Sequence, residues 1–171
     1  MDIYCTIEER YIQATEELRY GEAAKALQLL NELLVADASY ARTYFQIGII
    51  NYYYIKDYQA AGYYFSKCIE IDAEFPDVYE DFIKLLVFLN MEKKAKNTAS
   101  KALTVAGVNQ RLVYQQLGIL EEKNQNWNAA LDYYRKAYKF SLEKEDTDNS
   151  KSDIERIKDK LSRGARFVYS I

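Results

Sequence analysis

The chain alternates between helical runs of apolar residues and short polar breaks. Within each run, apolar and small side chains recur at spacings of three, four and seven residues, which places them on one face of a helix. Every second run opens with a tyrosine, and these tyrosines lie 35 residues apart: Tyr44, Tyr79 and Tyr114. The runs between them carry an alanine at a matching place: Ala61, Ala95 and Ala130. The pattern predicts antiparallel helix pairs that repeat along the chain.

Two glycines lie inside the first helix of a pair. Gly48 and Gly118 follow Tyr44 and Tyr114 by four residues. In a helix interior, glycine costs about 1 kcal/mol relative to alanine. We infer that the second helix of the pair packs closely on these positions, so that packing outweighs helix propensity.

The polar breaks divide the chain into repeated units. Breaks within the pairs are centred on residues 55–58, 89–92 and 124–127. We predict one domain, 1–171, that contains units at about 2–36, 40–74, 75–108 and 109–143. The first unit follows the pattern only loosely, through Ala23, Leu27 and Leu30 in its second helix. The second unit has one residue more than the others near Ile55.

These motifs resemble the tetratricopeptide repeat (TPR) family, whose signature contains an aromatic residue, Leu-Gly and Ala-x3-Phe. This chain has Y-x2-I-G from Tyr44, Y-x2-L-G from Tyr114, and the pairs Ala61-x3-Phe65 and Ala130-x3-Tyr134. The third unit departs from the signature, with Ile83 in place of the glycine and Ala99 in place of the aromatic residue. The resemblance implies an all-α fold: a right-handed superhelical stack of antiparallel helix pairs whose first helices line a concave groove.

The C-terminal region departs from the repeat. Residues 143–151 read as a polar linker, and Ser152 with Glu155 fits a capping box. We expect a capping helix at about 152–168 whose apolar stripe covers the last repeat: Ile154, Ile157, Leu161, Ala165 and Val168. Its other side is basic: Arg156, Lys160, Arg163 and Arg166. We interpret this helix as a solubilising cap, or alternatively as a docking site for an acidic partner. The last residues, 166–171, could pack on a second copy.

Composition limits the classes of function. The chain has 171 residues, 49% of them hydrophobic, with six glycines and one proline, which favours a folded helical protein. It contains no histidine, which removes Ser-His-Asp and Cys-His catalysis and histidine-containing metal sites. The scattered glycines form no phosphate-binding loop, and carboxylate clusters such as Glu121 with Glu122 fit solvated helix faces. We expect no enzyme activity, no metal and no cofactor.

Charge and hydropathy limit the partners. The net charge of −3 opposes binding to nucleic acid, which needs clustered basic residues. The N-terminus has no signal-peptide pattern, and no apolar run is long enough to span a membrane. We therefore expect a cytoplasmic protein that binds neither nucleic acid nor membrane.

Helical geometry assigns the side of each first helix that the packing stripe leaves over, and the resemblance implies that this side binds a partner. The predicted groove residues are Arg42, Phe45, Gln46, Ile49, Tyr52, Tyr53, Asp77, Glu80, Asp81, Lys84, Val87, Phe88, Leu112, Gln115, Gln116, Ile119, Glu122 and Lys123, with Cys5, Glu8, Glu9, Ile12, Thr15 and Glu16 in the first unit. Seven acidic and three basic side chains fall on this face. We expect it to bind a peptide or protein segment that carries apolar anchors and Lys or Arg.

Two alternatives remain open from the sequence. The chain could be a structural protein that forms homo-oligomers through its repeat ends or its C-terminal helix, given its seventeen tyrosines and apolar tail. A helical-repeat groove could also bind single-stranded RNA, although the acidic groove opposes this.

Overall fold

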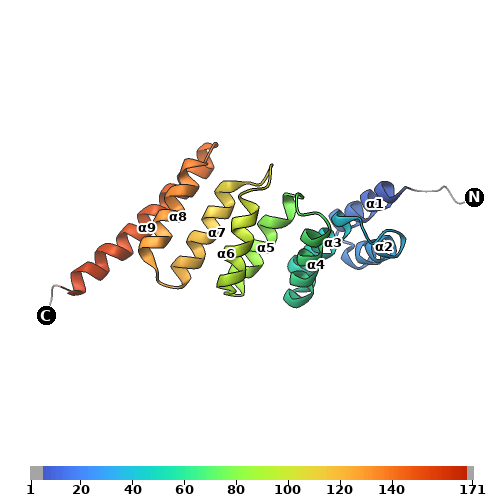
Figure 1. Cartoon of the computed structure of the whole chain (residues 1–171), viewed down its shortest axis with the longest axis horizontal. Coiled ribbons are helices and arrows are strands. Elements are labelled where there is room, and N and C mark those ends of the chain that lie inside the picture. Colours follow the sequence, from blue (N-terminus) through green and yellow to red (C-terminus); the bar gives the residue numbers. More distant parts are fainter. Residues whose placement is uncertain (1–5, 169–171) are drawn as a thin grey trace, which may run out of the picture. The chain divides into compact units, whose positions relative to one another are not determined.

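All regular secondary structure in the described part of the chain is helical. The computed structural model describes the backbone of residues 6–168 and the side chains of residues 6–163. The helices are α1 (Ile7–Arg19), α2 (Ala23–Ala36), α3 (Ala41–Ile49), η1 (Ile50–Ile55), α4 (Tyr58–Ile71), α5 (Asp77–Phe88), α6 (Glu92–Ala102), α7 (Gln110–Lys123), α8 (Trp127–Lys139) and α9 (Lys144–Val168) (Figure 1). Cys5, the side chains of Ala165, Arg166 and Val168, and most of the predicted tail lie outside the described residues.

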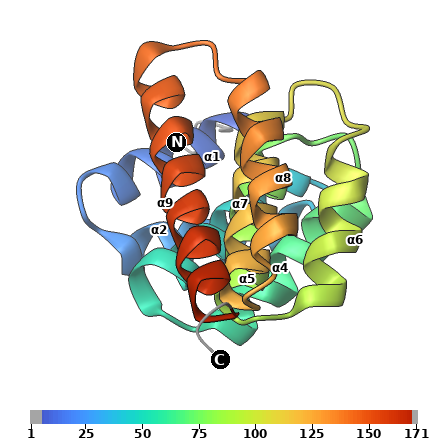
Figure 2. The same cartoon turned by 90° about the vertical axis from the view of Figure 1, so that its left-hand side faces the viewer.

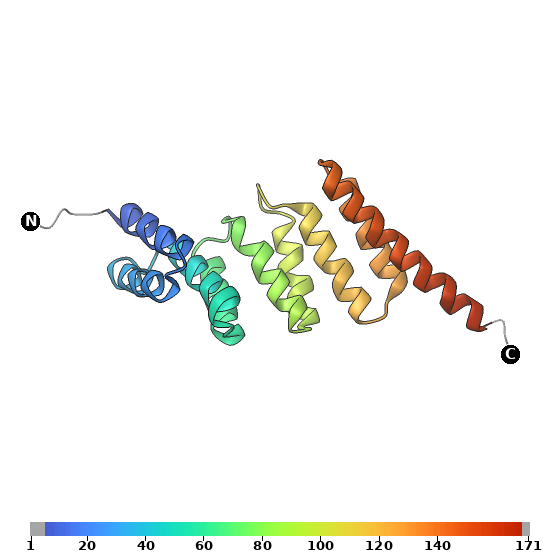
Figure 3. The ribbon, with the colours of Figure 1, turned by 180° about the vertical axis from the view of Figure 1, so that it is seen from behind.

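The chain divides into two compact units, residues 1–85 and 86–171, with the boundary inside α5. In the first unit, α1 packs on α2 and α3 packs on α4. In the second unit, α8 packs on both α7 and α9, and these three helices lie side by side in Figures 2 and 3. The pairs α1–α2, α3–α4 and α7–α8 are therefore confirmed, and so are the breaks between helices within each predicted pair. The single domain and the superhelical stack stay predictions.

Two of the three tyrosines that recur every 35 residues form the same kind of hydrogen bond. The Tyr44 hydroxyl donates to the carbonyl of Ala38 at 3.0 Å, and the Tyr79 hydroxyl donates to the carbonyl of Ala73 at 2.7 Å. Each tyrosine therefore ties the first helix of a pair to the loop that precedes it. Tyr114 differs, because its ring stacks on Phe140 with centroids 5.6 Å apart.

The two helical glycines lie against aromatic rings of the second helix, as the sequence predicts. A Cβ atom added at Gly48 would lie 2.5 Å from Cε1 of Phe65 on α4. A Cβ atom added at Gly118 would lie 2.6 Å from Cε1 of Tyr134 on α8. Both rings are fully buried, so each glycine provides the space that its aromatic partner fills.

The turns inside the helix pairs share one backbone feature that the sequence analysis did not identify. Each contains a residue with positive φ: Gly21 at 91°, Lys56 at 67°, Asn90 at 55° and Gln125 at 61°. A left-handed residue at the end of a helix reverses the chain and begins the return to the second helix. Three of these positions carry a residue other than glycine, so this local signal is weak in the sequence.

The extra residue near Ile55 is accommodated in a π-helix. Residues Ile50–Ile55 form η1, which continues α3 directly. A π-turn contains one residue more than an α-turn, so a single-residue insertion is absorbed without displacing the following turn. The buried Asn51 side-chain amide donates to the Ile47 carbonyl at 2.8 Å, where the register changes. The prediction of a one-residue insertion is therefore confirmed, and its structural form is η1.

Deleting Tyr54 is expected to convert η1 into regular α-helix at a cost below about 1 kcal/mol in the free energy of unfolding. The deletion removes the inserted residue, and Tyr54 is 51% exposed, so little packing is lost. Urea unfolding followed by circular dichroism measures the change. Deletion of Phe88 is the matched control, because it lies in the corresponding last turn of α5, which has no inserted residue; its loss should be several-fold larger. If both deletions lowered the free energy of unfolding equally, η1 would not be the result of a one-residue insertion.

The predicted linker at 143–151 is wrong, because α9 already begins at Lys144. Ser152 therefore lies inside the helix and does not cap it. Tertiary contacts hold this polar segment in helical form: Asp146 pairs with Arg111 at 2.9 Å, and the hydroxyl oxygens of Ser150 and Ser141 are 3.1 Å apart. The apolar stripe is confirmed for Ile154, Ile157 and Leu161, which belong to one cluster with α8.

Candidate functional site

The predicted groove residues on α3 mostly contact other side chains of the compact unit 1–85. Arg42 forms an ion pair with Glu8 of α1 at 3.1 Å, and both side chains remain more than half exposed. The Phe45 ring packs on Phe65 and Phe75, with centroid distances of 6.2 and 5.4 Å. The ring is half-buried, so Phe45 serves packing as well as the surface. Gln46 and Ile49 are also half-buried.

Two tyrosines of η1 face α5 in the same unit. The Tyr53 hydroxyl donates to Oδ1 of Asp81 at 2.6 Å, while 42% of Tyr53 stays exposed. Tyr52 contacts Tyr53 and also packs edge-on against Phe65. Burial raises the pKa of Asp81, although the Tyr53 hydrogen bond acts in the opposite direction. Asp81 is thus a partly buried carboxylate beside two rings, an environment that favours an additional positive charge.

The other predicted acids on α5 differ in exposure. Asp77 is exposed, whereas Glu80 pairs with Lys84 one turn further on, at 2.5 Å. Val87 is 3% exposed and is a core residue, so its assignment to the groove is wrong. The period-based assignment fails here because α5 buries a wider stripe than the other first helices, with Leu85, Leu86 and Val87 all buried.

Three predicted groove residues of the compact unit 86–171 show different environments. Phe88 is 54% exposed, and Gln116 is half-buried. The Lys123 ammonium donates to the carbonyls of Val87 and Phe88, at 2.7 and 3.1 Å. A lysine at the end of a helix compensates the carbonyl groups there. Lys123 therefore acts first as a cap on the C-terminus of α5.

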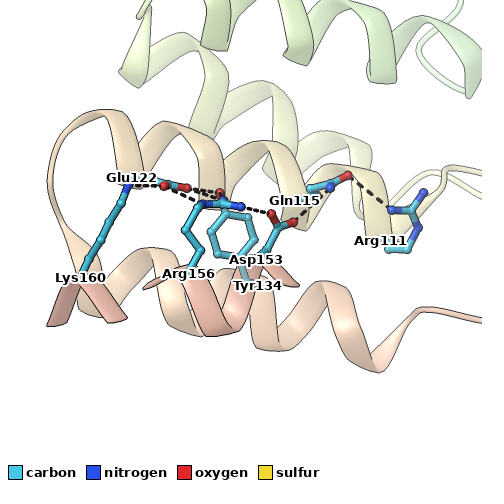
Figure 4. Close-up of polar contacts among 7 residues, drawn as sticks. All are labelled: Arg111, Gln115, Glu122, Tyr134, Asp153, Arg156 and Lys160. Carbon is cyan, nitrogen blue, oxygen red and sulfur yellow. Dashed lines mark hydrogen bonds and ion pairs between the residues drawn. The ribbon is translucent and has the colours of Figure 1, made fainter. Parts of the chain in front are cut away.

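Within residues 86–171, side chains of α9 bind the carboxylate of Glu122 on α7 (Figure 4). Oε2 of Glu122 lies 2.8 Å from Nη2 of Arg156, and its Oε1 lies 2.6 Å from Nζ of Lys160. Oε1 also accepts from Nε of Arg156 at 3.1 Å, so the guanidinium binds both carboxylate oxygens. The Tyr134 hydroxyl of α8 donates to the same carboxylate at 2.7 Å.

These donors change the acidity of Glu122. The hydrogen bond from Arg156 is the largest cause that lowers its pKa, with further lowering from Lys160 and Tyr134. Burial acts in the opposite direction, and the resulting pKa is about 2, compared with an ordinary value of 4.5. Glu122 is therefore charged throughout the physiological range and holds both cations of α9.

Further contacts continue along α7 and α9 towards the start of α9 (Figure 4). The Gln115 amide donates to Asp153 at 3.3 Å, and Arg111 donates to Gln115 at 3.4 Å. Ile119 packs on the apolar cluster that contains Ile157. Three predicted groove residues, Gln115, Ile119 and Glu122, are therefore occupied by the chain's own C-terminal helix.

Both sides of this contact are predicted from the sequence, but as separate features. Arg156 and Lys160 are predicted on the basic side of a capping helix, interpreted as solubilising or alternatively as a docking site for an acidic partner, and Glu122 is predicted in an acidic groove. The structure brings them together within one unit. Glu121 was expected to be solvated, which is wrong: it is 4% exposed and pairs with Lys96 at 2.7 Å. The signal that could have predicted the contact is the opposite charge of the two helices: acidic Glu122 on α7, and basic Arg156 and Lys160 on α9.

Two findings concern metal binding and thiol chemistry. Within residues 6–168 there is no group of three or more Cys, Asp or Glu side chains arranged to hold a metal ion. Burial raises the pKa of the Cys68 thiol to about 12, so this cysteine stays protonated and unreactive at neutral pH. No helix in the described part of the chain is both long and apolar enough to cross a membrane.

Comparison with known proteins places the fold. No family model and no curated protein matches the chain. YrrB, described as a TPR protein with an unusual peptide-binding site, is similar over 92% of this chain and 78% of its own, with 17% identity and a TM-score of 0.72. PilF of Pseudomonas aeruginosa covers 95% of this chain and 70% of its own, with 14% identity and a TM-score of 0.76.

A third similar structure is TTC0263, a TPR protein of Thermus thermophilus, which is 16% identical with a TM-score of 0.69 over 87% of this chain and 81% of its own. At these identities the similarity shows the fold alone. The chain has the all-α helical-repeat fold of TPR proteins, and the fold expected from the sequence motifs is confirmed.

Proposed function

We propose that this chain is a non-catalytic scaffold that binds a segment of a partner protein on the faces of its first helices. The observation that carries the proposal is α9 itself, a polypeptide segment bound to the α7 face through Glu122. This face accepts a helix that carries Arg and Lys beside apolar residues. The sequence predicts a ligand of the same chemistry, with apolar anchors and Lys or Arg. YrrB, which has the same fold, is described as having a peptide-binding site.

In the first unit, the proposed binding surface is made by Tyr52, Tyr53 and the acids of α5. Tyr53 is partly exposed beside Asp81, and Asp77 is exposed on the same helix as Asp81. Rigid rings supply contact area at small entropic cost, and carboxylates select a basic ligand and speed its approach. We propose that this surface binds Lys or Arg side chains of the partner, with apolar residues against the rings.

The double variant Tyr52→Ala/Tyr53→Ala is expected to weaken binding of basic-apolar peptides at least about tenfold, because two rings commonly provide more than 1.4 kcal/mol of binding free energy. A peptide library that varies in charge, read by fluorescence anisotropy, supplies the ligand and the measurement. The control is Tyr20→Ala/Tyr63→Ala, which removes two exposed rings elsewhere, 80% and 56% exposed. The proposal would be wrong if the wild type preferred acidic peptides, or if the two double variants, with helicity intact, bound the peptides equally.

The alternatives from the sequence stay predictions. Self-assembly through repeat ends or the C-terminal helix and a cytoplasmic location are both expectations from the sequence. Light scattering at high protein concentration tests the first, and localisation of the tagged protein in its host tests the second.

A further inference from the structure

We propose that α9 is a displaceable intramolecular ligand, and that the α7–α8 face beneath it binds a partner-protein helix with the same chemistry. That chemistry is an arginine and a lysine one turn apart, beside a stripe of apolar residues. The proposal rests on the proposed function, because it treats the α7 face as a binding surface. It adds that this surface is occupied by the chain's own C-terminal helix until a partner competes for it.

The polar half of the site selects the ligand. Glu122 binds the Arg156 guanidinium through both of its oxygens and binds Lys160 through one. The Arg156 guanidinium lies 5.6 Å from the centre of the Tyr134 ring, and the Lys160 ammonium lies 4.9 Å from that of Trp127. A carboxylate shared by two cations, each of which also lies over an aromatic ring, favours a pair of cations spaced by one helical turn.

The cationic side chains of α9 keep much of their contact with solvent. Side chains of Arg156 and Lys160 are 42% and 39% exposed, whereas that of Glu122 is 16% exposed. The two cations therefore lie on the solvent side of the contact, where a competing helix can approach, and the carboxylate lies beneath them on α7. We expect a competing helix to present the same two charges to Glu122.

The apolar half of the contact is small along residues 144–163 of α9. Between residues 144 and 163, the part of α9 whose side chains the structure describes, three side chains join the apolar cluster: Ile157, which is fully buried, and Ile154 and Leu161, which are half-buried. The shorter helix α8 buries Ala130, Leu131, Tyr134 and Ala137. Segments with few buried apolar contacts open locally at lower free energy than the core. We therefore expect α9 to detach while α7 and α8 stay paired.

A labelled peptide of residues 144–163 tests the proposal against the full-length chain. The variant Arg156→Ser/Lys160→Ser weakens α9 without altering the face, so it should bind the peptide at least tenfold more tightly than the wild type. The control Lys151→Ser/Lys158→Ser removes the same charge from exposed positions of α9 and should bind like the wild type. A peptide with the serine substitutions should not bind. Equal affinity of both double variants for the peptide would overturn the proposal.

Hydrogen exchange of the wild type gives a second, independent test that needs no variant. Amides of residues 154–161 should exchange at least tenfold faster than those in the middle of α8. Equal protection of the two helices would overturn the proposal, because α9 would then open only with the whole unit. A concentration-dependent dimer that the serine variant abolishes would assign the face to a second copy and would also overturn it. The Tyr52/Tyr53 experiment tests only a surface within residues 1–85. Its failure would therefore not change the interpretation of the results on α9.

Discussion

Alanine at Gly48 or Gly118 is expected to lower the free energy of unfolding by about 1–3 kcal/mol. The added methyl group would lie 2.5 Å from the Phe65 ring or 2.6 Å from the Tyr134 ring. Overpacking of this kind forces side chains and backbone to shift, and it outweighs the gain of about 1 kcal/mol in helix propensity. Phe65 cannot yield easily, because it is fully buried and packs on Phe45 and Phe82.

Gly62→Ala is the matched control for this prediction. Gly62 also lies inside a helix, α4, but an added Cβ would find its nearest neighbour, Leu85 Cδ2, at an ordinary 3.8 Å. This substitution should raise stability by up to about 1 kcal/mol, because only the propensity changes. Urea unfolding of the three variants measures the difference. Stabilisation by all three would show that the helices do not need the glycines for close approach.

Removing the Glu122 carboxylate is expected to cost about 2–3 kcal/mol at neutral pH. In Glu122→Gln, the Arg156 guanidinium and the Lys160 ammonium lose the charge that holds them, while the amide preserves the size of the side chain. The backbone amides of α9 should be the first to lose protection from hydrogen exchange, because the carboxylate connects α7 to that helix. Urea unfolding with hydrogen exchange measures both quantities. The control Glu155→Gln, at an exposed position of α9, should change neither.

The same carboxylate predicts how stability depends on pH. The folded pKa of Glu122 is about 2 and lies below the ordinary value of 4.5. The stabilisation is therefore complete above pH 4.5 and is lost as the pH falls towards 2, since the unfolded state then binds the proton more readily. A shift of this size corresponds to about 3 kcal/mol. The wild type should lose this amount relative to Glu122→Gln between pH 6 and pH 2, and parallel pH profiles of the two proteins would contradict the assignment.

Much of the fold could be predicted because its signals are local. Helix pairs, their breaks and the glycine positions follow from periodicity over a few turns, and the extra residue near Ile55 was visible as a change of spacing. The site was harder to predict. Its residues were named on α7 and α9, but which of them meet depends on how helices 34 residues apart in the chain pack. Val87 was misplaced because the width of a buried stripe is set by the neighbouring helices.

The sequence by itself determined which residues form helices, where the pairs turn and where small residues must face large ones, because backbone propensity and side-chain periodicity are properties of short segments. Only the tertiary structure decided that α9 begins at Lys144 and that Glu122 holds Arg156 and Lys160. A polar segment such as 144–151 becomes helical through the contacts it makes, and a carboxylate is solvated or paired according to what packs over it. Those contacts join residues that no local pattern connects.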